Sequence, residues 1–183
     1  MKILLHICCA PCAVKSVEAL REKGHEVTGF WYNPNIHPYN EWRLRRQAVE
    51  ELAEKIELPV IFDDSYDLVE NLHILMKDPE FGERCVECYK ERLTRTVRAA
   101  AENGFDAFTT TLLYSKYQNH KLVRRVCEFV AHNEWTNFYY EDFRPLWGRG
   151  ITASKKMGLY RQRWCGCIFS EFEAERERNE NEK

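Results

Sequence analysis

The chain has 183 residues, of which 44% are hydrophobic and 13% aromatic, so it can fill the core of one domain. Its 27 Lys and Arg against 29 Asp and Glu give a net charge of −2, which excludes a global field that attracts nucleic acid or membranes. The apolar runs are shorter than a membrane span and the first residues do not resemble a signal peptide, so we expect a cytoplasmic protein without membrane partners.

Short segments rich in β-branched and aromatic residues alternate along the chain with segments of helical periodicity. The predicted strands cover residues 2–7, 25–33, 58–64, 106–113 and 136–143. Apolar residues at helical spacing predict helices around residues 14–20, 48–56, 93–100 and 122–130. This alternation predicts an α/β, Rossmann-like, doubly wound fold with a mostly parallel sheet.

Two segments depart from the alternation. Residues 65–90 contain a helical stretch followed by a turn-rich segment with Pro79 and Gly82, which predicts a helical insertion over one edge of the sheet. Residues 171–183 are rich in glutamate and predict a solvated helix without a chemical role. The expected organisation is therefore one α/β domain over 1–170 and a charged tail over 171–183.

Eight cysteines are many for a chain that we expect in a reducing compartment, where structural disulfides are not maintained. Cys8 and Cys9 follow the first predicted strand, at the edge where ligands collect in open α/β sheets. Adjacent thiols suit an iron–sulfur cluster, which offers each thiolate a different iron, better than a single zinc ion. Cys12 is compatible with a ligand, a reactive thiol or a buried residue of the following helix.

Two further pairs have spacings typical of sites. Cys85 and Cys88 are three residues apart, which puts both sulfurs on one side of a loop or helical turn and provides half of a metal site. Cys165 and Cys167 flank a glycine, and a disulfide across so small a ring would be easily reduced, as a redox couple requires. A zinc or packing role is the alternative for this pair. Cys127 falls in an apolar helical stripe, which predicts core packing.

Five motifs together resemble the QueH family of epoxyqueuosine reductases, which complete the tRNA base queuosine. They are HICCAPC, ERCVECY, TTTLLYSKYQNH, EDFRPLW and YRQRWCGCIFS, and the resemblance extends from Leu5 to Ser170. It implies a fold like that of the PP-loop and HUP proteins and a cobalamin-independent oxidoreductase. The implied reaction is the two-electron deoxygenation of epoxyqueuosine in the anticodon loop of tRNA, with an electron donor that the sequence does not identify.

The resemblance also implies a cofactor and a redox pair. It implies a [4Fe-4S] cluster whose ligands are Cys8, Cys9, Cys85 and Cys88. It further implies that Cys165 and Cys167 form a redox-active disulfide, and that one additional iron lies beside the cluster.

The motifs do not assign the ligands of that iron or the proton donors. Cys12 and Asp142 are the candidate ligands of the additional iron. Asp142, His6, Tyr114 and Tyr117 are candidate proton donors for the reaction. For His6, which lies within an apolar run, a satisfied core histidine is at least as good an interpretation.

A local basic segment precedes the last cysteine pair. It contains six basic residues and no acid between residues 144 and 163, namely Arg144, Arg149, Lys155, Lys156, Arg161 and Arg163. Trp147 and Tyr160 interleave with them, a pattern typical of RNA binding, although an ordinary solvated face is the alternative. We expect the segment to guide tRNA, and expect Arg43, Arg45 and Arg46 to extend its surface.

Three other functions are alternatives to the reductase. A PP-loop ATPase needs a Gly-rich phosphate loop after the first strand, where this chain has CCAPCA. A zinc-stabilised RNA-binding module would use the same thiols in a closed structural site. A thiol-disulfide oxidoreductase would depend on Cys165 and Cys167 alone.

Overall fold

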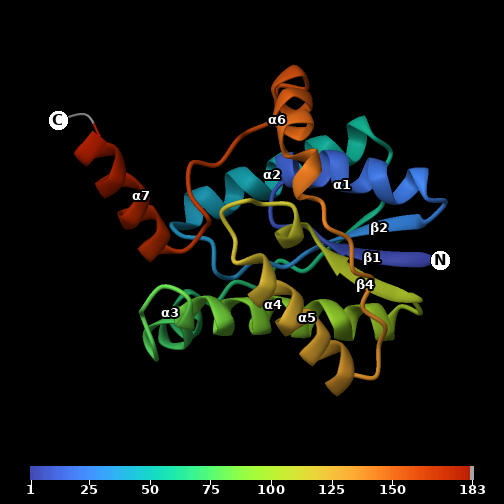
Figure 1. The fold of residues 1–183 in the computed structure, drawn as a ribbon, viewed down its shortest axis with the longest axis horizontal. Helices are drawn as coiled ribbons and strands as arrows, with labels where there is room; N and C mark the ends of the chain where they lie inside the picture. The colour runs from blue at the N-terminus through green and yellow to red at the C-terminus, as the bar shows by residue number, and fades with distance from the viewer. Residues whose placement is uncertain (182–183) are drawn as a thin grey trace.

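Four parallel strands form the central sheet in a computed structural model that describes residues 1–181 (Figure 1). They are β1 (Lys2–His6), β2 (Glu26–Trp31), β3 (Val60–Phe62) and β4 (Ala107–Thr110). The order across the sheet is β3-β2-β1-β4, and every pairing is parallel. The chain therefore builds the sheet outward to β3 and then returns to the other side of β1, which confirms the doubly wound α/β fold.

Helices cover both faces of the sheet (Figure 1). The upper layer consists of α1 (Ala10–Glu22), α2 (Tyr39–Lys55) and α6 (Trp147–Lys156). The lower layer consists of α3 (Leu68–Met76), α4 (Glu83–Glu102) and α5 (His120–Asn133). Single 3₁₀ turns, η1 (Thr111–Leu113) and η2 (Arg144–Leu146), follow β4 and precede α6. Helix α7 (Ile168–Asn181) projects away from the body of the molecule.

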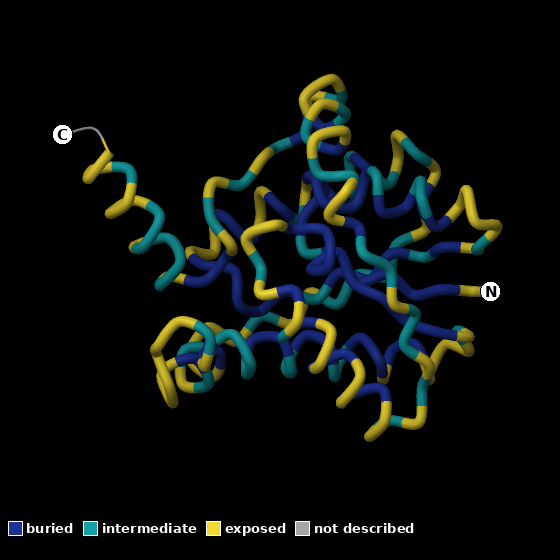
Figure 2. The backbone as a smooth tube through the Cα atoms, viewed as in Figure 1, coloured by how far each residue is buried: buried dark blue, intermediate teal, exposed yellow. Residues whose placement is uncertain are grey.

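The core lies on both faces of the two central strands. Ile3, Leu4 and Leu5 of β1 are completely buried, as expected of a parallel strand covered by helices on both sides. The buried parts of the chain are concentrated in the sheet and on the inner faces of α1 and α4 (Figure 2). In β2, a Cβ on Gly29 would lie 2.7 Å from Ile7 Cδ1 and 3.0 Å from Val60 Cγ2, so a larger residue there would displace the buried Ile7 side chain.

The predicted strand at 136–143 is wrong. Only Phe138 forms an isolated bridge, to Phe108 of β4, through the flanking backbone groups of Asn137 and Tyr139. Beyond this bridge the Asp142 carboxylate accepts a hydrogen bond from the backbone N–H of Arg144, which turns the chain into η2. The backbone of this segment therefore pairs with β4 at one residue and does not extend the sheet.

The helical segment after β3 is confirmed, but its second half has another role. Helix α3 starts at an Asp67 cap, whose side chain accepts the N–H of Glu70. Residues 83–90 are the first turns of α4, the helix that crosses back to β4, so Cys85 and Cys88 lie on a core helix. The predicted tail is helical through α7, and residues 182–183 lie outside the described part. Within residues 1–181, no helix is both long and apolar enough to cross a membrane.

Candidate thiol centre

The first thiols lie where the carboxyl ends of β1 and β4 meet, which is the topological switch point of the sheet. Cys8 follows β1 and Thr111 follows β4. The backbone N–H of Cys8 donates to Thr111 Oγ1 at 3.0 Å, and this hydroxyl donates to Cys8 Sγ at 3.2 Å. The two strand ends therefore fix the position of Cys8.

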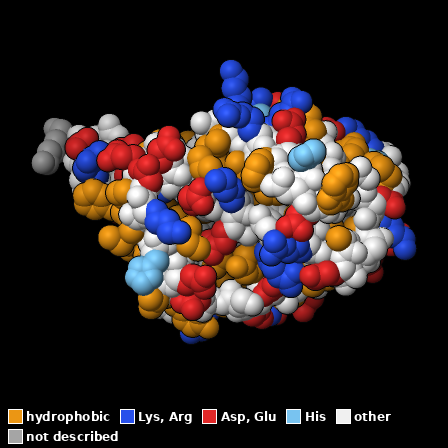
Figure 3. All heavy atoms as spheres, turned by 90° about the horizontal axis from the view of Figure 1, so that it is seen from below, with side chains coloured by type: hydrophobic (Ala, Val, Ile, Leu, Met, Phe, Trp, Pro, Cys, Tyr) orange, Lys and Arg blue, Asp and Glu red, His pale blue; other side chains and the backbone are white. Residues whose placement is uncertain are grey.

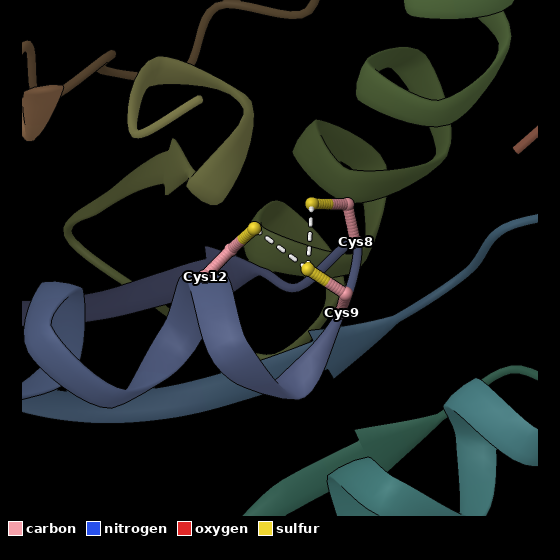
Figure 4. A group of neighbouring side chains, drawn as sticks. All are labelled: Cys8, Cys9 and Cys12. Carbon is pink, nitrogen blue, oxygen red and sulfur yellow. Dashed lines mark hydrogen bonds between the residues drawn. The ribbon is translucent and has the colours of Figure 1, made fainter. Parts of the chain in front are cut away.

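Cys8, Cys9 and Cys12 form one group, with all three sulfurs within 4.8 Å of one another. Cys9 Sγ lies between the others, 3.8 Å from Cys8 Sγ and 2.6 Å from Cys12 Sγ (Figure 4). Cys9 is the N-cap of α1 and Cys12 lies in its first turn, where the positive end of the helix dipole favours thiolate. Cys12, whose role the sequence left open, thus belongs with Cys8 and Cys9.

Within this group, Cys8 is the thiol that ionises most readily. Hydrogen bonds from Cys12 and Cys9 hold the pKa of Cys8 well below its usual range. Burial raises the pKa of Cys9, and the hydrogen bond to Cys8 raises that of Cys12. Gln162, from the segment before α7, donates its side-chain N–H to Cys9 Sγ at 2.8 Å. The three thiols, of which Cys8 is half-buried and the others buried, could therefore hold a metal ion through sulfur.

Four other cysteines line one small cavity of about 40 Å³. Cys85 and Cys88 reach it from the first turns of α4, and Cys165 and Cys167 reach it from the loop before α7. Cys165 is exposed and Cys167 is buried, and the side chain of Gln118 donates to Cys165 Sγ at 3.0 Å. Burial raises the pKa of Cys85 and of Cys88, so both are protonated thiols in the metal-free protein.

The side chain of Arg92 lies next to Cys88 of the second group. Its Nη2 is 3.3 Å from Cys88 Sγ, and its charge acts on Cys8 and Cys165. The predicted ligand set is thus divided, with Cys8 and Cys9 in the first group and Cys85 and Cys88 in the second. Sequence reasoning missed Arg92, although its position four residues after Cys88 on a helix was a usable signal.

A buried ion pair on α2 holds the loop that contains Cys165 and Cys167. Arg45 Nε donates to Glu41 at 2.6 Å, and its Nη1 and Nη2 donate to the carbonyls of Cys165 at 2.7 Å and Trp164 at 3.1 Å. Both charged side chains are at most 4% exposed, and Glu41 also accepts from the Tyr160 hydroxyl. The expectation that Arg45 extends an RNA-binding surface is therefore wrong, because Glu41 and two loop carbonyls satisfy its guanidinium inside the protein.

We expect Arg45→Met to lower the free energy of unfolding by about 3–5 kcal/mol, because it leaves the Glu41 carboxylate buried without its counter-charge. Urea unfolding of the two proteins measures this difference. The control is Arg124→Met, which breaks the solvent-exposed pair with Glu128 and should cost much less. Equal stability of Arg45→Met and the wild type would show that Glu41 is solvated or protonated, contrary to the geometry.

Of the four candidate proton donors, only Tyr117 lines the thiol cavity among the described residues. Burial and the Arg92 charge lower the pKa of His6 to about 4, and both ring nitrogens are engaged, by Thr110 and the Tyr32 carbonyl. Tyr114 donates its hydroxyl to the Trp147 carbonyl at 2.9 Å.

Asp142 does not line this cavity, and it is outside the group formed by Cys8, Cys9 and Cys12. Hydrogen bonds from Arg144 lower the pKa of Asp142 to about 2, so this carboxylate is ionised at neutral pH. His6 is accordingly a satisfied core histidine, and Asp142 is held in a surface ion pair.

The six residues of the basic segment are all exposed. They lie on η2, on α6 and on the irregular segment that leads to Cys165. Arg144 pairs with Asp142, whereas the other five have no carboxylate within 4.0 Å in the part of the chain that the structure describes. By contrast, the opposite face, formed by the lower helical layer, carries acidic and basic side chains intermixed (Figure 3). Among the described residues of this segment, cations without a carboxylate partner therefore lie along α6 and the stretch that leads into residues 165–167, the CGC loop.

Comparisons with known proteins agree on one family. A family profile described as Epoxyqueuosine reductase QueH matches residues 3–173. Proteins of that name from Dehalococcoides mccartyi and Thermotoga maritima are 34% and 33% identical to the chain; they align with 94% and 92% of it, and with 93% and 89% of their own lengths. A crystal structure described as a predicted subunit of tRNA methyltransferase from Methanocaldococcus jannaschii aligns with a TM-score of 0.59 at 10% identity, over 85% of this chain and 74% of its own, which supports the fold alone.

Proposed function

Since the chain belongs to the epoxyqueuosine reductase QueH family of oxidoreductases, we propose that it deoxygenates epoxyqueuosine in tRNA through the thiols at the β1/β4 edge. The observation that carries this proposal is the gathering of seven of the eight cysteines, from three distant segments, around one end of the sheet. Only Cys127, packed in α5, stays apart. The proposed reaction takes place in the cytoplasm, where thiols remain reduced.

The residues present fit a thiolate-bound metal centre. The candidate donors are sulfurs, most of them buried, and a buried guanidinium lies beside them to balance thiolate charge. We propose Cys8, Cys9, Cys85 and Cys88 as the ligands of a [4Fe-4S] cluster, with Cys12 as a ligand of an additional iron. When bound, these metals would supply single electrons and a Lewis acid for the epoxide oxygen.

The Cys165 and Cys167 pair can supply the electrons and protons that the proposed reaction consumes. Removing the oxygen of an epoxide as water, with formation of a C=C bond, consumes two electrons and two protons. Oxidation of two thiols to one disulfide releases two electrons and two protons, so one dithiol matches one turnover. The Gln118 N–H orients the Cys165 sulfur, Arg45 holds its backbone, and Tyr117 is the candidate that lines the same cavity for proton transfer. An unidentified donor then reduces the disulfide.

A zinc-stabilised RNA-binding module is the alternative, because the 3.8 Å between the sulfurs of Cys8 and Cys9 also suits two ligands of one tetrahedral ion. Anaerobic purification followed by iron, sulfide and zinc analysis, with electron paramagnetic resonance, separates the two functions. Iron and sulfide in the protein, together with conversion of epoxyqueuosine in tRNA to queuosine, support the reductase. Colourless protein with stoichiometric zinc and no conversion would refute it.

We further propose that the basic segment binds the tRNA. Its exposed cations lie along η2, α6 and the segment that enters the CGC loop, so phosphates held there would lie beside the thiol cavity. The anticodon loop is unpaired, so its modified base can be turned out of the stack toward the cavity.

We expect the double substitution Arg161→Gln and Arg163→Gln to weaken tRNA binding and to make it less sensitive to salt. Each lost phosphate contact makes the negative slope of log K against log salt shallower by roughly 0.7–0.9, so the loss of two contacts makes it shallower by roughly 1.4–1.8. The slope is measured by filter binding at salt concentrations from about 50 to about 200 mM. Arg124→Gln on α5 is the matched control, because Arg124 is already paired with Glu128. An unchanged slope in the double variant would place the tRNA elsewhere.

A further inference from the structure

Arg92 is a buried cation without a carboxylate partner. Its side chain lies in the third turn of α4 and is 2% exposed. Nε donates to the Cys88 carbonyl at 3.2 Å and Nη2 donates to Cys88 Sγ at 3.3 Å. The two other buried arginines of the described chain, Arg45 and Arg84, pair with Glu41 and Glu173, whereas no carboxylate lies within 4.0 Å of Arg92 in residues 1–181.

A guanidinium stays protonated inside a protein, so Arg92 needs a counter-charge. A buried charge without one is strongly destabilising, because water no longer solvates it. The only sulfur within hydrogen-bond distance of the guanidinium, among the described residues, is Cys88 Sγ. The group that can compensate Arg92 is thus the Cys88 sulfur, once it binds a metal as thiolate.

Cysteines bind a metal centre as deprotonated thiolates, so they carry negative charge when the centre is bound. A [4Fe-4S] cluster with four thiolate ligands is a net anion, and its negative charge increases when it accepts an electron. A fixed positive charge beside the cluster therefore stabilises the reduced form more than the oxidised form. Arg92 lies where it would exert this effect on the Cys88 sulfur, 3.3 Å from its Nη2.

We propose that Arg92 is the built-in counter-charge of the metal centre, a positioning residue that stabilises the bound cluster and raises its reduction potential. The inference rests on the proposed cluster and adds a residue outside the predicted ligand set. It explains why α4 contains a buried arginine with thiols in place of a carboxylate. The same guanidinium orients Cys88, since it binds the carbonyl and the sulfur of that residue.

The test compares wild type, Arg92→Met and Arg84→Met with and without reconstituted iron–sulfur cluster. In wild type, reconstitution should raise Tm, because a ligand that binds only the native state stabilises it. We expect this rise to be smaller in Arg92→Met by at least roughly 2 °C, with no loss of stability in the metal-free form. Arg84→Met removes a buried arginine that is already paired with a carboxylate, Glu173, so it should lower Tm in both forms and leave the rise unchanged.

Redox titration followed by electron paramagnetic resonance gives the second measurement. The midpoint potential should become more negative in Arg92→Met and return toward the wild-type value in Arg92→Lys, which keeps the charge. An unchanged potential and an unchanged rise in Tm in Arg92→Met would overturn the inference. So would an Arg92→Lys protein as impaired as Arg92→Met, because the role would then be packing. Wild-type protein that takes up no iron would instead refute the proposed function itself.

Discussion

Replacing Cys85 with serine is expected to abolish the iron–sulfur cluster and to lower turnover at least about 100-fold. The serine hydroxyl is a poor ligand for iron compared with a thiolate, and it cannot replace the sulfur that α4 presents to the cavity. The measurement is iron and sulfide content, with visible absorbance, of anaerobically reconstituted protein, followed by conversion of epoxyqueuosine-bearing tRNA.

Two features make the Cys85 substitution informative. Cys85 lies in the first turn of a long core helix whose later turns pack against β1 and β4, so the fold does not depend on its side chain. Cys127→Ala is the matched control, because this thiol is completely buried in α5 and outside both thiol groups. The control should keep its colour and activity. A brown, four-iron Cys85→Ser protein would remove Cys85 from the ligand set.

Much of the fold could be predicted because its signals are local. Strands β1, β2 and β4 are short runs buried on both sides, and their helices show regular apolar stripes. The prediction of a strand at 136–143 was wrong because aromatic composition does not reveal whether a sheet edge is available for pairing. That segment makes one bridge to Phe108 and then turns at Asp142. Whether a β-like segment extends a sheet is decided by tertiary contacts.

The thiols of the site could be predicted from the sequence, whereas its buried charged side chains could not. Cysteines at strand ends and in close spacing stand out in any sequence, whereas Arg45 and Arg92 look like ordinary basic residues of helix surfaces. Both are buried, because loop carbonyls and Glu41 satisfy the first, and the carbonyl and sulfur of Cys88 accept from the second. Only the packing of α2 and α4 against distant segments reveals this. The division of the thiols into two groups, with Cys12 in the first, likewise depends on three-dimensional contacts.

Cys167→Ser should have the opposite profile from Cys85→Ser, with a retained cluster and lost turnover. A single thiol at position 165 cannot form the intramolecular disulfide, so the two electrons and two protons of one turnover are no longer available from this loop. We expect multiple-turnover activity to fall at least about 100-fold while iron content stays at the wild-type level. The same metal analysis and tRNA conversion assay measure both quantities.

The loop itself should survive the substitution of Cys167, since its shape is set by other residues. Arg45 holds the carbonyls of Trp164 and Cys165, and the backbone N–H of His37 donates to the Gly166 carbonyl at 2.8 Å. Ser170→Ala tests this point, because that hydroxyl accepts from the Gly166 N–H at 3.2 Å and donates to the Cys167 carbonyl at 2.7 Å but has no redox chemistry. The control should retain activity. If Cys167→Ser turned over at the wild-type rate with its cluster intact, the electrons would have to reach the epoxide without the dithiol, and the proposed role of the CGC loop would be wrong.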